Sequence, residues 1–252
     1  MQLMENYGLL WRKFFIRNRP KGMRMKRSEI NQAISLAKKA LEDIHFKLPE
    51  FSEWSKKEWE EHDKELGTIK KVMLGWDVSD YGSDDFANCG CVLFTIRNGD
   101  LYHPETGVPY CEKVLVFNDA VKQIIPFHFH RLKTEDIINR GNGMMEIELF
   151  NSTADGKMDK TSEVKVFMDG IEHTLIPGKV YDISPGSSIT LTPGLYHRFG
   201  CRPGAGNLVC GEVSKINDDN TDNIFAEKQI RFSDIVEDEE PLHPLCNEIA
   251  KM

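Results

Sequence analysis

From Gly67 onward the chain consists of short segments rich in Val, Ile, Leu, Phe and Thr, with turn signals between them. Examples are CVLFTIRNGD, KVLVFND, MMEIELFNS and SSITLTPG. The Asn-Gly, Asp-Gly and Pro-Gly pairs between such segments are typical of tight turns that connect neighbouring strands. No long helical pattern interrupts the series, so the pattern does not favour β-α-β units. We therefore predict a mainly β fold, with a barrel formed by about residues 68–236.

The residues before this series have a helical pattern instead. Ser28 is a suitable N-cap, and apolar side chains then recur at helical spacing as far as Ile44. A second helix with one charged face is expected over residues 52–66. We predict that these helices form an N-terminal segment of about residues 28–66 that leads into the barrel.

Residues 1–24 differ in composition from the rest of the chain. Basic side chains dominate them, and charge interrupts every apolar run, which is not the pattern of a secretory signal. We expect a disordered or loosely docked basic extension here, followed by a single domain of residues 25–252.

The overall composition limits the classes of partner. A net charge of -8 argues against a nucleic-acid binder that works by charge alone. No apolar run approaches the roughly 20 residues that a membrane span needs. The 6 cysteines in 252 residues are scattered and too few for a disulfide scaffold, so we predict reduced thiols. We accordingly expect a cytoplasmic protein that binds neither nucleic acid nor membrane. We also expect a homodimer, an expectation that the composition itself does not supply.

The segment PFHFHRLKTED carries potential metal ligands at short spacing. His128 and His130 are two apart, so in a strand they project to the same face, and Glu135 follows after a short bend. Imidazole and carboxylate ligands suit a divalent ion such as Mn, Fe, Co, Ni or Zn. The alternative is an exposed edge with solvated histidines, which is the more frequent meaning of an isolated His-x-His.

A second segment, GSSITLTPGLYHRFG, ends in His197 just after a Pro-Gly turn. The two segments together resemble the paired motifs of the cupin superfamily, although Lys122 and Cys201 replace a glycine and an asparagine of the usual pattern. The resemblance implies a jelly-roll-like cupin barrel and a metal site with four ligands. Those ligands are His128, His130, Glu135 and His197.

Nearly everything from residue 25 onward resembles the D-lyxose isomerase family within the cupins. The resemblance rests on MKRSEIN, HFHRLKTEDIINRGNG, TPGLYHRF, GEVSKINDDNTDNIF and EDEEPLHPLCN. It implies interconversion of D-lyxose and D-xylulose, and also of D-mannose and D-fructose, with Mn²⁺ preferred and Co²⁺, Ni²⁺, Fe²⁺ or Zn²⁺ as other candidates. The partner is then a small sugar.

Aldose–ketose isomerisation through an enediol needs a base that moves a proton between C1 and C2, whereas a hydride shift does not. Resemblance favours Glu227 as this base, while Glu212 has the better strand context or is a structural partner. The resemblance also implies site roles for Lys133 and Lys113. Arg231 is a candidate for binding sugar oxygens, and a solvated arginine is the equal alternative.

Two other functions fit a cupin with these ligands. An iron-dependent dioxygenase would use the same four side chains, but such sites often have apolar walls, unlike one with lysine and glutamate. A non-catalytic sugar-binding cupin is the other alternative, although such proteins often lose ligands.

Overall fold

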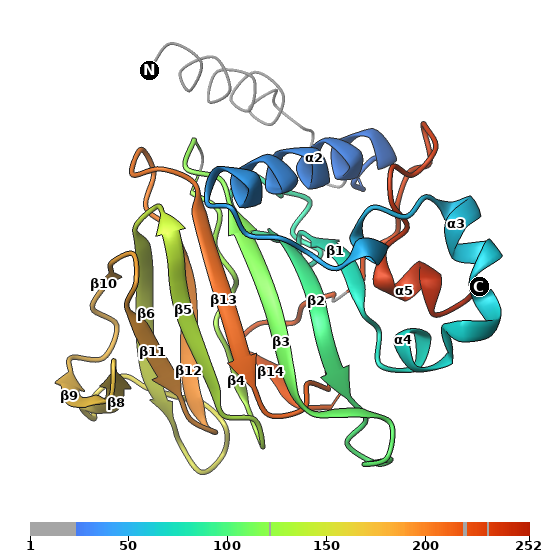
Figure 1. Ribbon diagram of the computed structural model, residues 1–252. Helices are drawn as coiled ribbons and strands as arrows, with labels where there is room; N and C mark the ends of the chain where they lie inside the picture. The colour runs from blue at the N-terminus through green and yellow to red at the C-terminus, as the bar shows by residue number, and fades with distance from the viewer. Residues whose placement is uncertain (1–23, 121, 219–220, 231) are drawn as a thin grey trace.

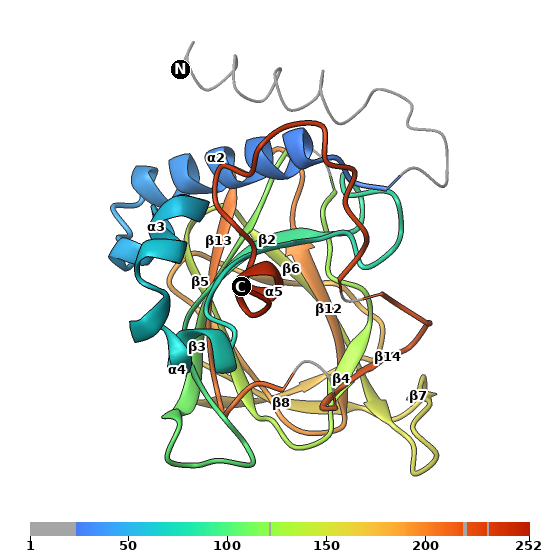
Figure 2. The same cartoon turned by 90° about the vertical axis from the view of Figure 1, so that its right-hand side faces the viewer.

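The computed structural model describes residues 24–120, 122–218, 221–230 and 232–252. Two antiparallel sheets curl toward each other around a shared core, as Figure 1 shows from the side and Figure 2 approximately along the barrel. The mainly β fold predicted from the segment pattern is confirmed.

The larger sheet has eight strands in the order β1-β2-β3-β13-β5-β11-β8-β9. Their bounds are β1 Gly75–Ser79, β2 Cys91–Gly99, β3 Gly107–Phe117, β5 Glu135–Asn142, β8 Val164–Met168, β9 Ile171–Leu175, β11 Ser188–Leu191 and β13 Leu208–Ser214. Strand β13 lies between β3 and β5, which are distant from it in sequence. This order is what brings candidate site residues from three parts of the chain together.

The smaller sheet has the order β10-β6-β12-β4-β14, with β7 paired to β6. Its strands are β4 His128–His130, β6 Met145–Ser152, β7 Met158–Asp159, β10 Tyr181–Ile183, β12 Leu195–Cys201 and β14 Asn223–Phe225. In the pairing of β12 with β4, His197 stands directly opposite His128. The two predicted motifs therefore meet in one sheet.

The core between the sheets is apolar. Phe117, Ile147, Leu149, Ile189 and Leu208 each expose 1% or less of their surface. Burial of this kind stabilises a fold by about 25 cal/mol for each Å² of apolar surface removed from water. The packed core gives the site residues at its edge a fixed frame.

Helix α2 (Arg27–Asp43) covers the outer face of the larger sheet, across the upper part of β2, β3 and β13 in Figure 1. It begins at Arg27 rather than after Ser28, so the predicted N-cap is wrong. Lys26 is the N-cap, and its backbone N–H donates to the Glu29 carboxylate. The Ser28 hydroxyl instead donates to Asp238, a contact that the chain provides only when folded.

The single helix expected over residues 52–66 is replaced by short pieces. They are the 3₁₀ turn η1 (Glu50–Ser52), helix α3 (Lys56–Glu61), the 3₁₀ turn η2 (Asp63–Glu65) and helix α4 (Gly67–Lys71). Ser55 caps α3 in a capping box with Glu58, which restarts the helix inside the predicted range. The aromatic residues pack on the main body as predicted, since Trp59 is buried and the ring of Phe51 lies 5.3 Å from that of Phe94.

The C-terminal segment folds back and contacts the start of the N-terminal helix α2. Arg27, at the start of α2, forms ion pairs with Glu237 and with Glu248 of helix α5 (Cys246–Ile249). All 6 cysteines are free, in agreement with the prediction of reduced thiols. Within the part of the chain that the structure describes, no helix has the length and apolar character needed to cross a membrane. The expected extension of residues 1–24 falls, except for Arg24, outside the described residues.

Candidate active site

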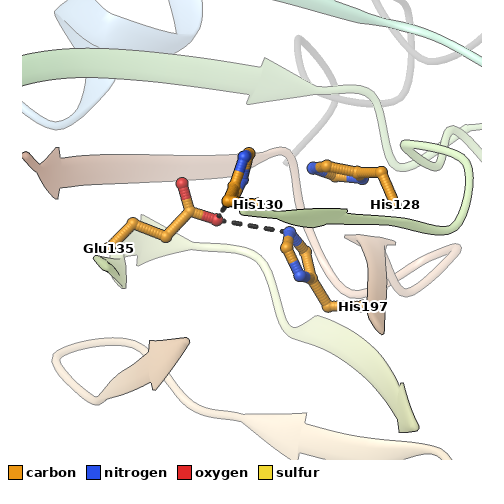
Figure 3. A group of neighbouring side chains, drawn as sticks. All are labelled: His128, His130, Glu135 and His197. Carbon is orange, nitrogen blue, oxygen red and sulfur yellow. Dashed lines mark hydrogen bonds and ion pairs between the residues drawn. The ribbon is translucent and has the colours of Figure 1, made fainter. Parts of the chain in front are cut away.

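Four buried side chains from neighbouring strands meet in one place, as Figure 3 shows. His128 and His130 project from β4, Glu135 is the first residue of β5, and His197 lies on β12. Their potential ligand atoms all lie within 4.8 Å of one another. The structure thus brings together all four residues that the two sequence motifs predicted.

Two of the imidazoles have their ring orientation defined by the backbone. Nδ1 of His128 lies 2.9 Å from the Pro126 carbonyl oxygen, and Nδ1 of His197 lies 2.9 Å from that of Leu195. A carbonyl oxygen only accepts, so each Nδ1 must donate its proton. In the neutral rings this leaves a lone pair on Nε2, the form in which an imidazole binds a metal.

The histidine charges are unfavourable in this buried position. Burial holds the pKa of His128 well below its usual value, and the neighbouring His197 and His130 lower it further. Burial also lowers the pKa of His130, although Glu135 opposes the shift. Both rings are consequently neutral at neutral pH and ready to act as ligands.

Glu135 remains ionised despite its burial. Burial alone would raise its pKa, but the contacts with His130 and Lys133 outweigh this and hold the pKa well below the usual range. Oε1 of Glu135 lies 3.2 Å from Nε2 of both His130 and His197 (Figure 3). Oε2, the other carboxylate oxygen, lies 2.8 Å from Nζ of Lys133.

These atoms fit a divalent metal ion. Nε2 of His197 is buried and has no hydrogen-bond partner among the described residues, yet it faces Oε1 of Glu135. With the ring proton on Nδ1, a nitrogen lone pair and an anionic oxygen therefore face each other, and a cation between such groups would satisfy both. Three imidazoles and one carboxylate are a donor set suited to a first-row transition metal.

A second group of charged residues lies beside the cluster. Lys133 exposes 3% of its surface, and its Nζ atom lies 2.9 Å from Oε1 of Glu212 on β13. Lys113 on β3 stands opposite Glu212 in the sheet, with its Nζ atom 3.4 Å from the same oxygen. Burial acts to lower the pKa of Lys133, but Glu135 and Glu212 together raise it above its ordinary value. Lys133 is therefore a fixed cation between the two carboxylates.

The charged residues and three of the four clustered side chains line one cavity. Its walls contain both apolar and polar side chains, namely Tyr81, Leu93, Lys113, Leu115, Ile125, His128, His130, Lys133, Glu135, Phe199, Glu212, Asn217, Asn223 and Phe225. A cavity with ammonium, carboxylate and amide groups on one side suits a ligand with several hydroxyl groups.

Two predicted site residues are not found in this lining. Glu227 lies two residues beyond β14, and its side chain is exposed to solvent. Arg231 lies outside the described residues. The role of each stays a prediction.

Two residues of the cavity region were missed by the sequence analysis. Asn217 accepts a hydrogen bond from Nζ of Lys133 at 3.1 Å, and Asp222 accepts from the backbone N–H groups of Leu132 and Lys133. Both belong to the polar run NDDNTD, residues 217–222, between β13 and β14. The one feature of the sequence that could have indicated these two residues is the polar run itself, just after a barrel strand.

Comparison with solved structures identifies the class of fold. L-ribose isomerase from Acinetobacter sp. DL28 superimposes with a TM-score of 0.51 at 15% identity, over 81% of this chain and 93% of that chain. A variant of that enzyme in complex with L-ribose has a TM-score of 0.54 at 14% identity, over 84% of this chain and 98% of that chain. At this low identity the likeness shows only the fold. The molecule is a cupin β-barrel with a buried His-His-Glu-His cluster, as the paired motifs predicted.

Comparison of sequences places the chain within that class. The family model for D-lyxose isomerase matches residues 25–249. The D-lyxose/D-mannose isomerase of Serratia proteamaculans is 40% identical over 90% of this chain and 99% of its own length, and that of Escherichia coli O157:H7 is 39% identical over 89% and 98%. The chain belongs to the D-lyxose isomerase family. It is an aldose–ketose isomerase. Membership in this family excludes the two alternatives, an iron-dependent dioxygenase and a non-catalytic sugar-binding cupin.

Proposed function

We propose that the protein is a metal-dependent isomerase that interconverts D-lyxose with D-xylulose and D-mannose with D-fructose. The observation that carries this proposal is the buried cluster of His128, His130, Glu135 and His197 beside the ion-paired Lys133 and Glu212. The names of the two relatives support both sugars. D-mannose has the configuration of D-lyxose at C2, C3 and C4, so one cavity can hold the reacting end of either sugar.

We further propose that the four clustered residues hold Mn²⁺, with Co²⁺, Ni²⁺, Fe²⁺ or Zn²⁺ as weaker substitutes. A divalent ion at this position supplies positive charge that stabilises the oxygens of an enediolate. The open-chain sugar would lie in the cavity with its reacting end at the cluster. A homodimer in the cytoplasm remains the expected state of the enzyme.

Glu212 is the best-supported base for the proton transfer between C1 and C2. Its carboxylate is buried in the cavity and receives contacts from Lys133 at 2.9 Å and Lys113 at 3.4 Å. These contacts fix the position of the carboxylate, and the ammonium groups beside it can donate to hydroxyl oxygens of the sugar. Glu227 is exposed and remains the alternative base that the resemblance favours.

A metal-reconstituted screen tests the proposal. The metal-free full-length chain is loaded with each of the five ions and incubated with D-lyxose, D-mannose and other aldopentoses and aldohexoses. We expect the highest turnover with D-lyxose or D-mannose in the presence of Mn²⁺, with the ketose products identified by chromatography. No turnover of either sugar with any ion, or full turnover in a preparation free of metal, would contradict the proposal.

A further inference from the structure

Asp222 contacts the connection that joins two of the clustered residues. It lies between β13 and β14, exposes 4% of its surface, and faces the turn that links His130 at the end of β4 to Glu135 at the start of β5. It reaches that turn from about 90 positions farther along the chain. A buried carboxylate needs several donors to offset the loss of hydration.

Three consecutive backbone N–H groups donate to Asp222, two of them to its carboxylate. Oδ1 of Asp222 accepts from Leu132 at 2.7 Å, and Oδ2 accepts from Lys133 at 3.2 Å. The backbone oxygen of Asp222 accepts from Arg131 at 3.2 Å. These three bonds fix the whole turn, so they set both the spacing of His130 from Glu135 and the starting point of the Lys133 side chain.

The same carboxylate faces the unused side of the His130 ring. Oδ2 of Asp222 lies 3.8 Å from Nδ1 of His130, which has no hydrogen-bond partner among the described residues. This distance is too long for a hydrogen bond. Without a metal, Oε1 of Glu135 lies closer, at 3.2 Å from Nε2 of His130, and competes for the ring proton. With a cation bound between Nε2 and Oε1, the negative charge of Asp222 favours the tautomer with the proton on Nδ1. That tautomer leaves the lone pair on Nε2, the atom that faces Glu135 in the cluster.

His130 differs in this respect from the other two histidines. Backbone carbonyls hold the Nδ1 protons of His128 and His197, whereas no carbonyl of the described part of the chain does so for His130. Metal-binding histidines usually donate their second nitrogen to a carboxylate or carbonyl, and loss of that partner typically lowers metal affinity by 10- to 100-fold. Asp222 is the carboxylate placed to fill this role.

We propose that Asp222 is a positioning residue for the metal site, which acts through the 131–133 turn and through the proton on Nδ1 of His130. The inference rests on the metal dependence in the proposed function. The inference concerns only the affinity for the metal ion, so it can be wrong even if the protein is a metal-dependent isomerase.

The test compares two substitutions in the same segment. Asp222→Asn keeps the size and one acceptor oxygen but places an NH₂ group opposite either Leu132 N–H or Lys133 N–H. Asp218→Asn is the matched control, because it removes the same charge while Thr221 can still donate to the amide oxygen and the Asp218 backbone oxygen still accepts from Asp222. The affinity of each metal-free full-length protein for Mn²⁺ is measured by calorimetry, together with its melting temperature without metal.

We expect Asp222→Asn to bind Mn²⁺ about 10- to 100-fold more weakly than the wild type, and Asp218→Asn to bind within about twofold of it. The zinc-loaded wild type should show the His130 proton on Nδ1 in a long-range ¹H–¹⁵N correlation spectrum. Equal Mn²⁺ affinity in wild type and Asp222→Asn would overturn the proposal, as would equal losses in both variants.

The spectrum decides the question if Asp222→Asn does not fold, since it needs only the wild type. A His130 ring bound through Nδ1, with its proton on Nε2, would overturn the proposal. A wild type that binds no divalent ion at all would instead refute the metal dependence itself, so the two failures are distinguishable.

Discussion

Nζ of Lys133 lies 2.9 Å from Oε1 of Glu212, a residue 79 positions farther along the chain. The same ammonium group lies 2.8 Å from Glu135, so one cation joins a clustered residue to the proposed base. The two carboxylates can share this buried space because Lys133 lies between them. The first two predictions concern this arrangement.

Glu212→Gln removes the carboxylate but keeps its size. If Glu212 moves the proton, turnover should fall by about 10²–10⁴-fold, the usual contribution of general acid–base catalysis. Metal content should stay near one ion per chain, because Glu212 is outside the four clustered residues. Steady-state kinetics and elemental analysis measure the two quantities.

The control is Glu227→Gln, which we expect to change turnover less than about threefold because the side chain is exposed. The reverse result, with Glu227 essential and Glu212 dispensable, would restore the base that the resemblance favoured. If neither carboxylate matters and deuterium passes from C2 to C1 without exchange into water, a hydride shift replaces the enediol mechanism.

Lys133→Met should destabilise the metal-free protein because it leaves the buried Glu135 carboxylate without its lysine and leaves Glu212 with Lys113 alone. Loss of one partner of a buried pair costs about 3–5 kcal/mol. The pKa of Glu135 is lowered in the folded wild type, so this stabilisation is present above the unfolded pKa of about 4.3 and is lost as pH falls through the folded value. Denaturant unfolding should therefore show a difference between wild type and variant that is full at pH 8 and decreases only below about pH 4.3, and a difference that stays constant in more acidic buffer would contradict the assignment.

Removal of the metal should abolish activity, and Mn²⁺ or Co²⁺ should restore it. Because the pKa of His128 lies well below 6.5, its imidazole needs no deprotonation at neutral pH. Metal retention during dialysis should then be constant from about pH 8 to 6.5 and decrease only in more acidic buffer. Glu135→Gln should lose metal as well as activity over the whole range. Retention that already halves between pH 8 and 7 would show that His128 and His130 are not neutral there.

Cys89 is the cysteine with the greatest exposure, yet it should react slowly with alkylating reagents. Burial, with smaller contributions from Asp80 and Asp85, raises its pKa from 9.0 to about 11, although Ser83 opposes the shift. The thiolate fraction at pH 8 should be about 100-fold lower than for an unshifted thiol. Mass spectrometry after iodoacetamide treatment checks this, with Cys89→Ser as the control. The same shift affects the free energy of unfolding. The contribution of the protonated Cys89 thiol is fully present below about pH 9 and is lost as pH rises through the folded pKa of about 11.

Deletion of residues 1–24 should leave activity and melting temperature nearly unchanged. The expectation rests on the basic composition of this segment and on the start of the family match at residue 25. Differential scanning calorimetry and the D-lyxose assay on the shortened chain provide the measurement. A large loss of folded protein would indicate that the segment contributes to the domain.

The linear sequence was enough to determine the class of fold and the four clustered residues. Alternation and turn pairs depend only on neighbouring residues, and the two histidine motifs contain their own spacing. His128 and His130 had to share a face in any strand. The tertiary structure added the pairing of β12 with β4, which places His197 directly opposite His128.

Other features were decided by contacts between distant segments. At the start of helix α2, Arg27 and Ser28 bind residues 237 and 238, far along the chain, which occupies the Ser28 side chain that the local sequence offered as N-cap. The sheet order places Glu212 beside Lys133 and Lys113, which favours it over Glu227 although the local sequence left both open. The sequence did not single out Asp222 from its polar run. Its role depends on backbone N–H groups about 90 positions away, which no local pattern predicts. Local patterns therefore identified the residues whose spacing is fixed within one short motif. Burial and long-range strand pairing decided which other charged residues surround them.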